Sequence, residues 1–78
     1  MIESNARAGV HVSVVSPEEA YDGTAELWCG RELMGITMLS AGGLQLRIDP
    51  RPDGGPWLID LTSLTHAIDE ANRLIAAY

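Results

Sequence analysis

The stretch TAELWCGRELMGITML, residues 24–39, decides the fold because a turn signal divides it into two segments of alternating character. Gly30 would be the first residue of a two-residue loop with Arg31, and glycine at that position suits a type II′ hairpin turn. Such a turn pairs Cys29 with Glu32 and sets the pairing of the residues on either side. We therefore expect an antiparallel β-hairpin centred on this glycine.

The register of this hairpin sorts its side chains onto two faces, because opposed residues share a face and successive residues alternate. The first face is apolar and is predicted to carry Ala25, Leu27, Cys29, Met34, Ile36 and Met38. The second face is mixed and is predicted to carry Thr24, Glu26, Trp28, Leu33, Gly35, Thr37 and Leu39. The apolar face predicts one side of a packed core, and the mixed face predicts a surface that is only partly shielded.

A third strand follows, because residues 44–49 alternate as cleanly as the hairpin does. A three-residue loop at residues 40–42 would pair Met38 with Leu44 and would place the apolar side chains of the third strand on the apolar face. A four-residue loop would instead bury a glutamine and an arginine of that strand, at a high desolvation cost. We therefore predict the three-residue loop.

The segment before the hairpin predicts a further strand and a short helix. Residues 9–15 alternate between valine and more polar side chains, as a half-buried strand does. Residues 16–20, SPEEA, resemble a single helical turn with proline at its first position. We expect residues 1–8 to form a flexible N-terminal arm.

The segment after the third strand predicts a loop and then a helix. Residues 49–56 hold three prolines and so cannot form a central strand. Residues 57–60 are compatible with a short fifth strand or with an extended lead-in, and both alternatives stay open. From Leu61 onward apolar residues recur at helical spacing, and Thr62 or Ser63 is predicted to cap the helix.

Together these elements predict an α+β fold, in which an antiparallel β-meander of four or five strands carries one C-terminal α-helix on one face. Residues 9–78 would form this single small domain. A helix of roughly fifteen residues spans only some two dozen ångströms, at ~1.5 Å per residue. It can cover one face of such a sheet, so we expect the other face to be open.

Composition and charge narrow the classes of function. The 78 residues are 46% hydrophobic and 21% charged, which is typical of a globular chain. Eleven acidic residues stand against five arginines and no lysine, which gives a net charge of −6 and disfavours binding to nucleic acids or anionic membranes. The N-terminal residues lack the apolar segment of a signal peptide, so we expect a cytoplasmic location. The absence of lysine beside plentiful alanine, glycine and arginine is typical of a GC-rich bacterial genome.

The open face predicts a site of association. Trp28 and Leu33 are paired there in the expected register, with Thr37 and Leu39 farther along the same strand. An apolar patch on an exposed sheet marks an interaction surface, and small domains commonly gain stability by oligomerising. We expect a second copy of the chain to cover this patch; the alternatives are the N-terminal arm and the proline-rich loop.

Two further groups of residues are candidate binding elements. Glu26 and Arg47 project from the open face and would form a small polar pocket, or else a solvated ion pair worth ~0–1 kcal/mol. Arg51, Asp53 and Trp57 in the proline-rich loop would form an exposed recognition element. The alternative for that loop is a plain connector between two elements.

No catalytic set and no cofactor site is predicted. Cys29 lies among apolar side chains, where the thiolate is disfavoured, and a single cysteine cannot form an internal disulfide. His11 and His66 lack the spacing of a zinc site, and the sequence has no glycine-rich phosphate-binding motif. We therefore expect no metal and no cofactor.

These observations favour a small acidic, non-enzymatic cytoplasmic protein that acts through protein–protein association, first as a homodimer through the open sheet face. Two alternatives stay open. One is an acidic inhibitor or antitoxin-like partner of a basic protein, which the net charge of −6 motivates. The other is a protein that binds a small ligand at a subunit interface.

Overall fold

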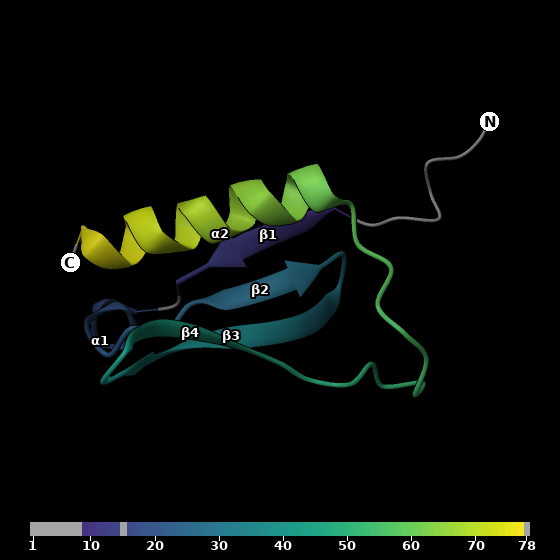
Figure 1. The fold of residues 1–78 in the computed structure, drawn as a ribbon, viewed down its shortest axis with the longest axis horizontal. Helices are drawn as coiled ribbons and strands as arrows, with labels where there is room; N and C mark the ends of the chain where they lie inside the picture. The colour runs from purple at the N-terminus through teal and green to yellow at the C-terminus, as the bar shows by residue number, and fades with distance from the viewer. Residues whose placement is uncertain (1–8, 15, 78) are drawn as a thin grey trace.

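The computed structural model describes residues 9–14 and 16–77. Their elements follow in the order β1 (Val10–Ser13), α1 (Pro17–Tyr21), β2 (Glu26–Cys29), β3 (Glu32–Ser40), β4 (Gly43–Ile48) and α2 (Leu61–Ala76). The strands form one antiparallel sheet in the order β1-β2-β3-β4, and α2 runs along one side of it (Figure 1). The predicted α+β meander with a C-terminal helix is confirmed. The predicted N-terminal arm, residues 1–8, lies outside the described residues.

The segment before α2 is a lead-in to the helix. Within residues 57–60 only Ile59 forms an isolated bridge, so the sheet in the described part of the chain has four strands and no fifth. Asp60 is the N-cap of α2, and its carboxylate accepts a hydrogen bond from the N–H of Ser63 at 2.9 Å. The prediction of Thr62 or Ser63 as the cap is therefore wrong, because a carboxylate at the end of the lead-in already fills that role.

The hydroxyl of Ser63 instead joins α2 to β1. It accepts a hydrogen bond from the N–H of Val10 at 2.7 Å and donates one to the carbonyl oxygen of Val10 at 3.3 Å. These contacts satisfy backbone groups at the outer edge of the sheet, and they hold the helix beside β1 (Figure 1). Ala67 and Ala71 are buried on α2, and their small side chains let the helix approach closely.

The core lies between α2 and the sheet. Its buried cluster consists of Val10, Leu27, Cys29, Met34 and Ala67. Partly buried side chains pack around that cluster: Val12, Leu46, Trp57, Ile59 and Leu64. The β2 side chains that were predicted to be apolar and inward therefore do face the helix.

The turn between β2 and β3 has the predicted register at its tip. Cys29 pairs with Glu32, and Trp28 pairs with Leu33. Gly30 has a φ of 63°, which the first loop position of a type II′ turn requires and which glycine adopts at little cost.

One step farther from this turn, the register shifts. Met34 is the extra residue of a β-bulge, so that Leu27 pairs with Gly35. An extra residue reverses the faces of everything beyond it on that strand. The prediction that Ile36 and Met38 face the helix is therefore wrong, because both lie on the opposite face.

Thr37 and Leu39 are correspondingly misplaced by the sequence prediction, since they lie on the side of α2. Thr37 is 5% exposed, and its Oγ1 accepts a hydrogen bond from the N–H of Ala25 at 2.7 Å. The same oxygen donates to the carbonyl oxygen of Gly23 at 2.7 Å. Thr37 is thus the hydrogen-bond partner of two backbone groups just before β2 begins, and it is not part of the open face.

Gly35, next to the bulge, allows the backbones of β3 and β4 to come close together. A Cβ built on Gly35 would lie 3.0 Å from the carbonyl carbon and still closer to the carbonyl oxygen of Arg47. It would also lie 3.1 Å from Cα of Ile48. The backbone of β4 therefore comes so close to β3 that a residue with a side chain does not fit there.

The turn between β3 and β4 has a two-residue loop, since Ser40 pairs with Gly43. The three-residue loop predicted at residues 40–42 is wrong, and Met38 pairs with Gln45. The bulge and the shorter loop each shift the register by one residue, so the two errors cancel in β4. Its apolar side chains do lie on the side of α2, as predicted: Leu44, Leu46 and Ile48.

Candidate interaction face

The face of the sheet opposite α2, here called the open face, is built from rows of residues that are paired across the strands. The central row is Ser13, Glu26, Ile36 and Arg47, in the order β1 to β4. A second row holds His11, Trp28 and Leu33, and a third holds Met38 and Gln45. The bulge at Met34 aligns these rows, because it brings Leu33 level with Trp28 and Ile36 level with Glu26.

An apolar stripe runs along β3 on the open face. Leu33 is 37% exposed and Met38 is 45% exposed, while Ile36 between them is partly buried. Trp28 adds its ring from β2, beside Leu33. In the described part of the chain, α2 packs on the other side of the sheet and α1 contacts α2, so this stripe faces outward.

Two of the four residues predicted for the interaction face are found there. Trp28 and Leu33 lie on the open face, whereas Thr37 and Leu39 do not. The alternation of the sequence could not reveal Ile36 and Met38 as their replacements, because the bulge interrupts it. The one available signal was the isolated glycine at position 35, since a glycine inside a strand is typical of a bulge.

Charged groups flank the apolar stripe on both sides. Glu26 on β2 accepts a hydrogen bond from Nε1 of Trp28 at 3.1 Å. Arg47 on β4 forms an ion pair with Asp49, in which Nε and Oδ1 are 3.1 Å apart. Glu26 and Arg47 both project from the open face, as predicted, but Ile36 lies between them. The predicted polar pocket between Glu26 and Arg47 does not form, because the side chain of Ile36 separates them, and Thr37 is buried on the other side of the sheet.

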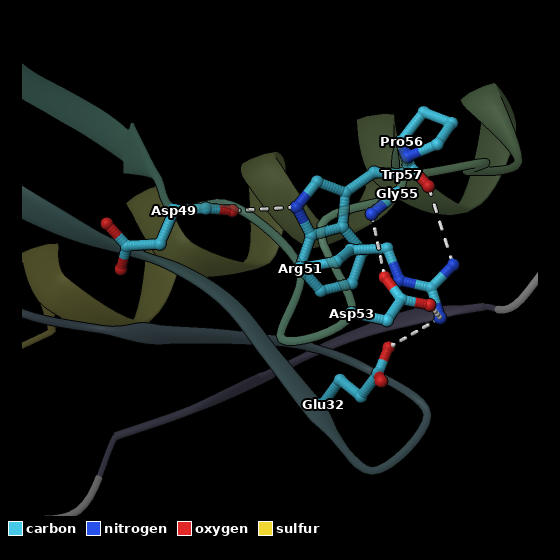
Figure 2. A network of polar contacts seen from close by, with 7 residues as sticks. All are labelled: Glu32, Asp49, Arg51, Asp53, Gly55, Pro56 and Trp57. Carbon is cyan, nitrogen blue, oxygen red and sulfur yellow. Dashed lines mark hydrogen bonds and ion pairs between the residues drawn. The ribbon is translucent and has the colours of Figure 1, made fainter.

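The proline-rich loop brings its three predicted residues together (Figure 2). The guanidinium of Arg51 lies 5.5 Å from the ring centroid of Trp57, and its Nη2 lies 3.6 Å from Oδ2 of Asp53. The same nitrogen lies 3.3 Å from Oε1 of Glu32, in the β2–β3 turn. Nε1 of Trp57 donates to the carbonyl oxygen of Asp49 at 2.7 Å.

This network holds the loop against the sheet. The guanidinium of Arg51 contacts groups within the loop and one group across from it, and the ring of Trp57 packs against the core. Trp57 therefore does not contribute to the open face. These contacts give the loop a fixed shape, and its role as a recognition element stays a prediction.

Cys29 lies in the core, whereas His11 and His66 line one pocket beside β1 together with Glu70. Burial raises the pKa of the Cys29 thiol, the nearby carboxylate of Glu32 raises it further, and the Arg51 guanidinium acts in the opposite direction. The thiol is therefore protonated at neutral pH, when a nucleophilic cysteine would need to be ionised. His11 and His66 are exposed, and no group of three or more potential metal ligands occurs among residues 9–14 and 16–77.

A second apolar feature lies on the side of α2. The helix follows β1, so it leaves a cavity of about 100 Å³ between itself and β4. The cavity is lined by Leu27, Thr37, Leu44, Gln45, Leu46, Ile68, Ala71 and Asn72. Its volume is below that of typical small-molecule sites, so it does not indicate a site for a sizeable ligand.

The fold and its surfaces define a small α+β protein whose antiparallel sheet carries a helix on one side and a mixed apolar and charged surface on the other. Among the described residues, neither helix has the length and apolar character that crossing a membrane requires. Comparison of the chain with models of protein families, with curated proteins and with solved structures gave no match in any of the three.

Proposed function

We propose that this protein is a non-enzymatic association module that forms a homodimer through its open face. The observation that carries the proposal is the apolar stripe of Leu33, Ile36 and Met38, with Trp28 beside it, on the side of the sheet that α2 leaves uncovered. Apolar side chains that line up along a strand are costly to expose to water, and a partner that covers them removes that cost.

The size of the chain supports self-association. A domain of 78 residues buries a smaller fraction of its surface than a larger domain does, so its stability margin is narrow. The core also depends on small side chains on α2, and Leu27 and Met34 are the only large side chains in the described residues that are fully buried. Covering the open face with a second sheet would give the protein a second apolar layer.

The open face and the composition of the chain agree with the other properties that we propose. It has few basic groups, which agrees with a protein that binds no nucleic acid. Composition favours a bacterial protein of the cytoplasm. An acidic partner for a basic protein is the second candidate, favoured by the net charge of −6. Capture of basic proteins that weakens with added salt would support that candidate, since screening reduces attraction between charges.

The test compares two matched substitutions. Ile36→Glu places a charge in the middle of the apolar stripe, and Ile68→Glu places the same charge on α2, where the isoleucine is 40% exposed. Light scattering during size-exclusion chromatography, across a range of concentrations, would measure the mass of each protein. Circular dichroism would confirm that both variants are folded.

We expect the wild type and Ile68→Glu to be dimers and Ile36→Glu to be a monomer. A wild-type protein that stays monomeric at several hundred micromolar would contradict the proposal. Dissociation by Ile68→Glu but not by Ile36→Glu would also contradict it, because the interface would then lie on the side of α2.

A further inference from the structure

The charges on the open face select one orientation for the dimer. We infer that two copies pack face to face about a two-fold axis that runs along β3, so that Glu26 of each copy faces Arg47 of the other. This inference rests on the proposed homodimer, and it specifies how the two copies meet.

The geometry begins with the central row of the open face. Ile36 pairs with Glu26 on one side and with Arg47 on the other. Each charged residue is therefore one strand away from Ile36, at a spacing of ~4.8 Å. Opposite charges thus stand at equal distances on either side of the apolar stripe.

When two sheets stack with their strands roughly aligned, the two-fold axis between them runs close to the strand direction or close to the perpendicular direction. An axis along β3 exchanges the two sides of the sheet, so it places β2 of one copy over β4 of the other. Glu26 then faces an arginine of the second copy, and the same contact occurs twice because the interface is isologous. Leu33, Ile36 and Met38 meet their own counterparts and form the apolar centre of the interface.

An axis across the strands places β2 of one copy over β2 of the other, and β4 over β4. Glu26 would then face the glutamate of the second copy, and Arg47 would face the arginine. Like charges brought together at an interface are strongly unfavourable, and this repulsion excludes incorrect orientations. The alternation of charge across β3 therefore distinguishes the two arrangements.

The distances allow the proposed contacts. Packed sheets lie ~10 Å apart, and a glutamate and an arginine that extend toward each other can bridge that gap. In the monomer Arg47 is held by Asp49, but these side chains are 55% and 41% exposed. An exposed pair of this kind contributes little, so the arginine is available to a partner.

The test uses charge reversal. Glu26→Arg gives a chain with arginine at both positions, and Arg47→Glu gives a chain with glutamate at both. Each variant alone would meet like charges in the proposed dimer, and we expect its dissociation constant to rise at least about tenfold. A one-to-one mixture of the two variants would bring only opposite charges together, and we expect it to form a heterodimer.

Two further proteins complete the experiment. A chain that carries both reversals restores opposite charges at both contacts, so it should dimerise like the wild type even if one single variant is poorly folded. The control reverses the exposed ion pair of Glu70 and Arg73 on α2, far from the open face, and should leave the dissociation constant unchanged. Native mass spectrometry would identify each species by mass.

The outcomes separate the orientation from the proposed function. Single reversals that dimerise as tightly as the wild type would overturn the orientation and leave the homodimer standing. Weakened single variants that neither the mixture nor the double reversal restores would overturn it as well. A wild-type protein that is a monomer under the same conditions would overturn both.

Discussion

Gly35→Ala is the substitution that most directly tests the link between sequence and fold. The added methyl group would lie 3.0 Å from the carbonyl carbon of Arg47 and 3.1 Å from Cα of Ile48. Favourable contacts between carbon atoms occur at ~3.5–4.0 Å. Both atoms belong to the backbone of β4, so no side-chain rotation relieves the overlap and the strand itself must move.

The expected cost follows from that movement. Forcing an extra methyl group into a packed site costs about 1–3 kcal/mol. Displacing β4 also weakens nearby hydrogen bonds, such as the one from the N–H of Asp49 to the carbonyl oxygen of Met34 at 2.9 Å, at about 1 kcal/mol each. We expect a total loss of about 3 kcal/mol, from a stability of about 4–12 kcal/mol for a chain of this length.

Thermal unfolding followed by circular dichroism would measure the loss, which corresponds to a fall in Tm of about 12–24 °C for a domain of this size. Gly42→Ala is the matched control, because a Cβ at Gly42 meets no atom within 4 Å. It should leave Tm unchanged or raise it slightly by restricting the unfolded chain. The reasoning would be refuted if Gly35→Ala melted within a few degrees of the wild type, or if both substitutions lowered Tm equally.

Two other predictions concern buried groups near the core. Thr37→Val keeps the shape of the side chain but leaves the N–H of Ala25 and the carbonyl of Gly23 without their partner, so we expect a loss of about 2–3 kcal/mol in urea unfolding. Thr65→Val, at an exposed hydroxyl of α2, should cost less than about 0.5 kcal/mol and serves as its control. Burial raises the pKa of the Cys29 thiol in the folded protein, so its contribution to stability is fully present below the unfolded pKa of ~8.5 and is lost as the pH rises through the folded pKa. The difference in unfolding free energy between the wild type and Cys29→Ala should therefore shrink from pH 7 to alkaline pH, and a constant difference would count against this explanation.

The fold was predictable from the sequence because its strongest signals are local. A glycine at position 30 fixes the tip of the first hairpin, and the apolar spacing after residue 60 identifies the helix. The exact register of the strands was harder to predict from the sequence. The bulge at Met34 accompanies the close approach of the β3 and β4 backbones at Gly35, and a pattern of alternating residues does not predict it. It moved Ile36 and Met38 to the open face.

The candidate site was predictable only near the hairpin turn for the same reason. Trp28 and Leu33 lie before the bulge, where the register holds, and the predicted residues beyond it on β3 were assigned to the wrong face. On β4 each side chain was predicted on the correct face of the sheet, although its partner on β3 was predicted wrongly. The β3–β4 loop is one residue shorter than predicted, and this offsets the extra residue of the bulge. Agreement between a hydrophobic pattern and a presumed loop length is therefore weaker evidence for register than it first looks.

The bond between Ser63 and Val10 has a consequence for the behaviour of the protein at high concentration. A strand at the border of a sheet can recruit strands from other molecules and start a fibre. Here the first outward-facing amide and carbonyl of one border already belong to the helix, while β4 forms the other border. Lateral growth through β1 is therefore disfavoured, because an added strand would compete with the hydroxyl for these groups and with α2 for the space beside β1. Ser63→Ala would free these two backbone groups, and only the packing of α2 beside β1 would then protect this border.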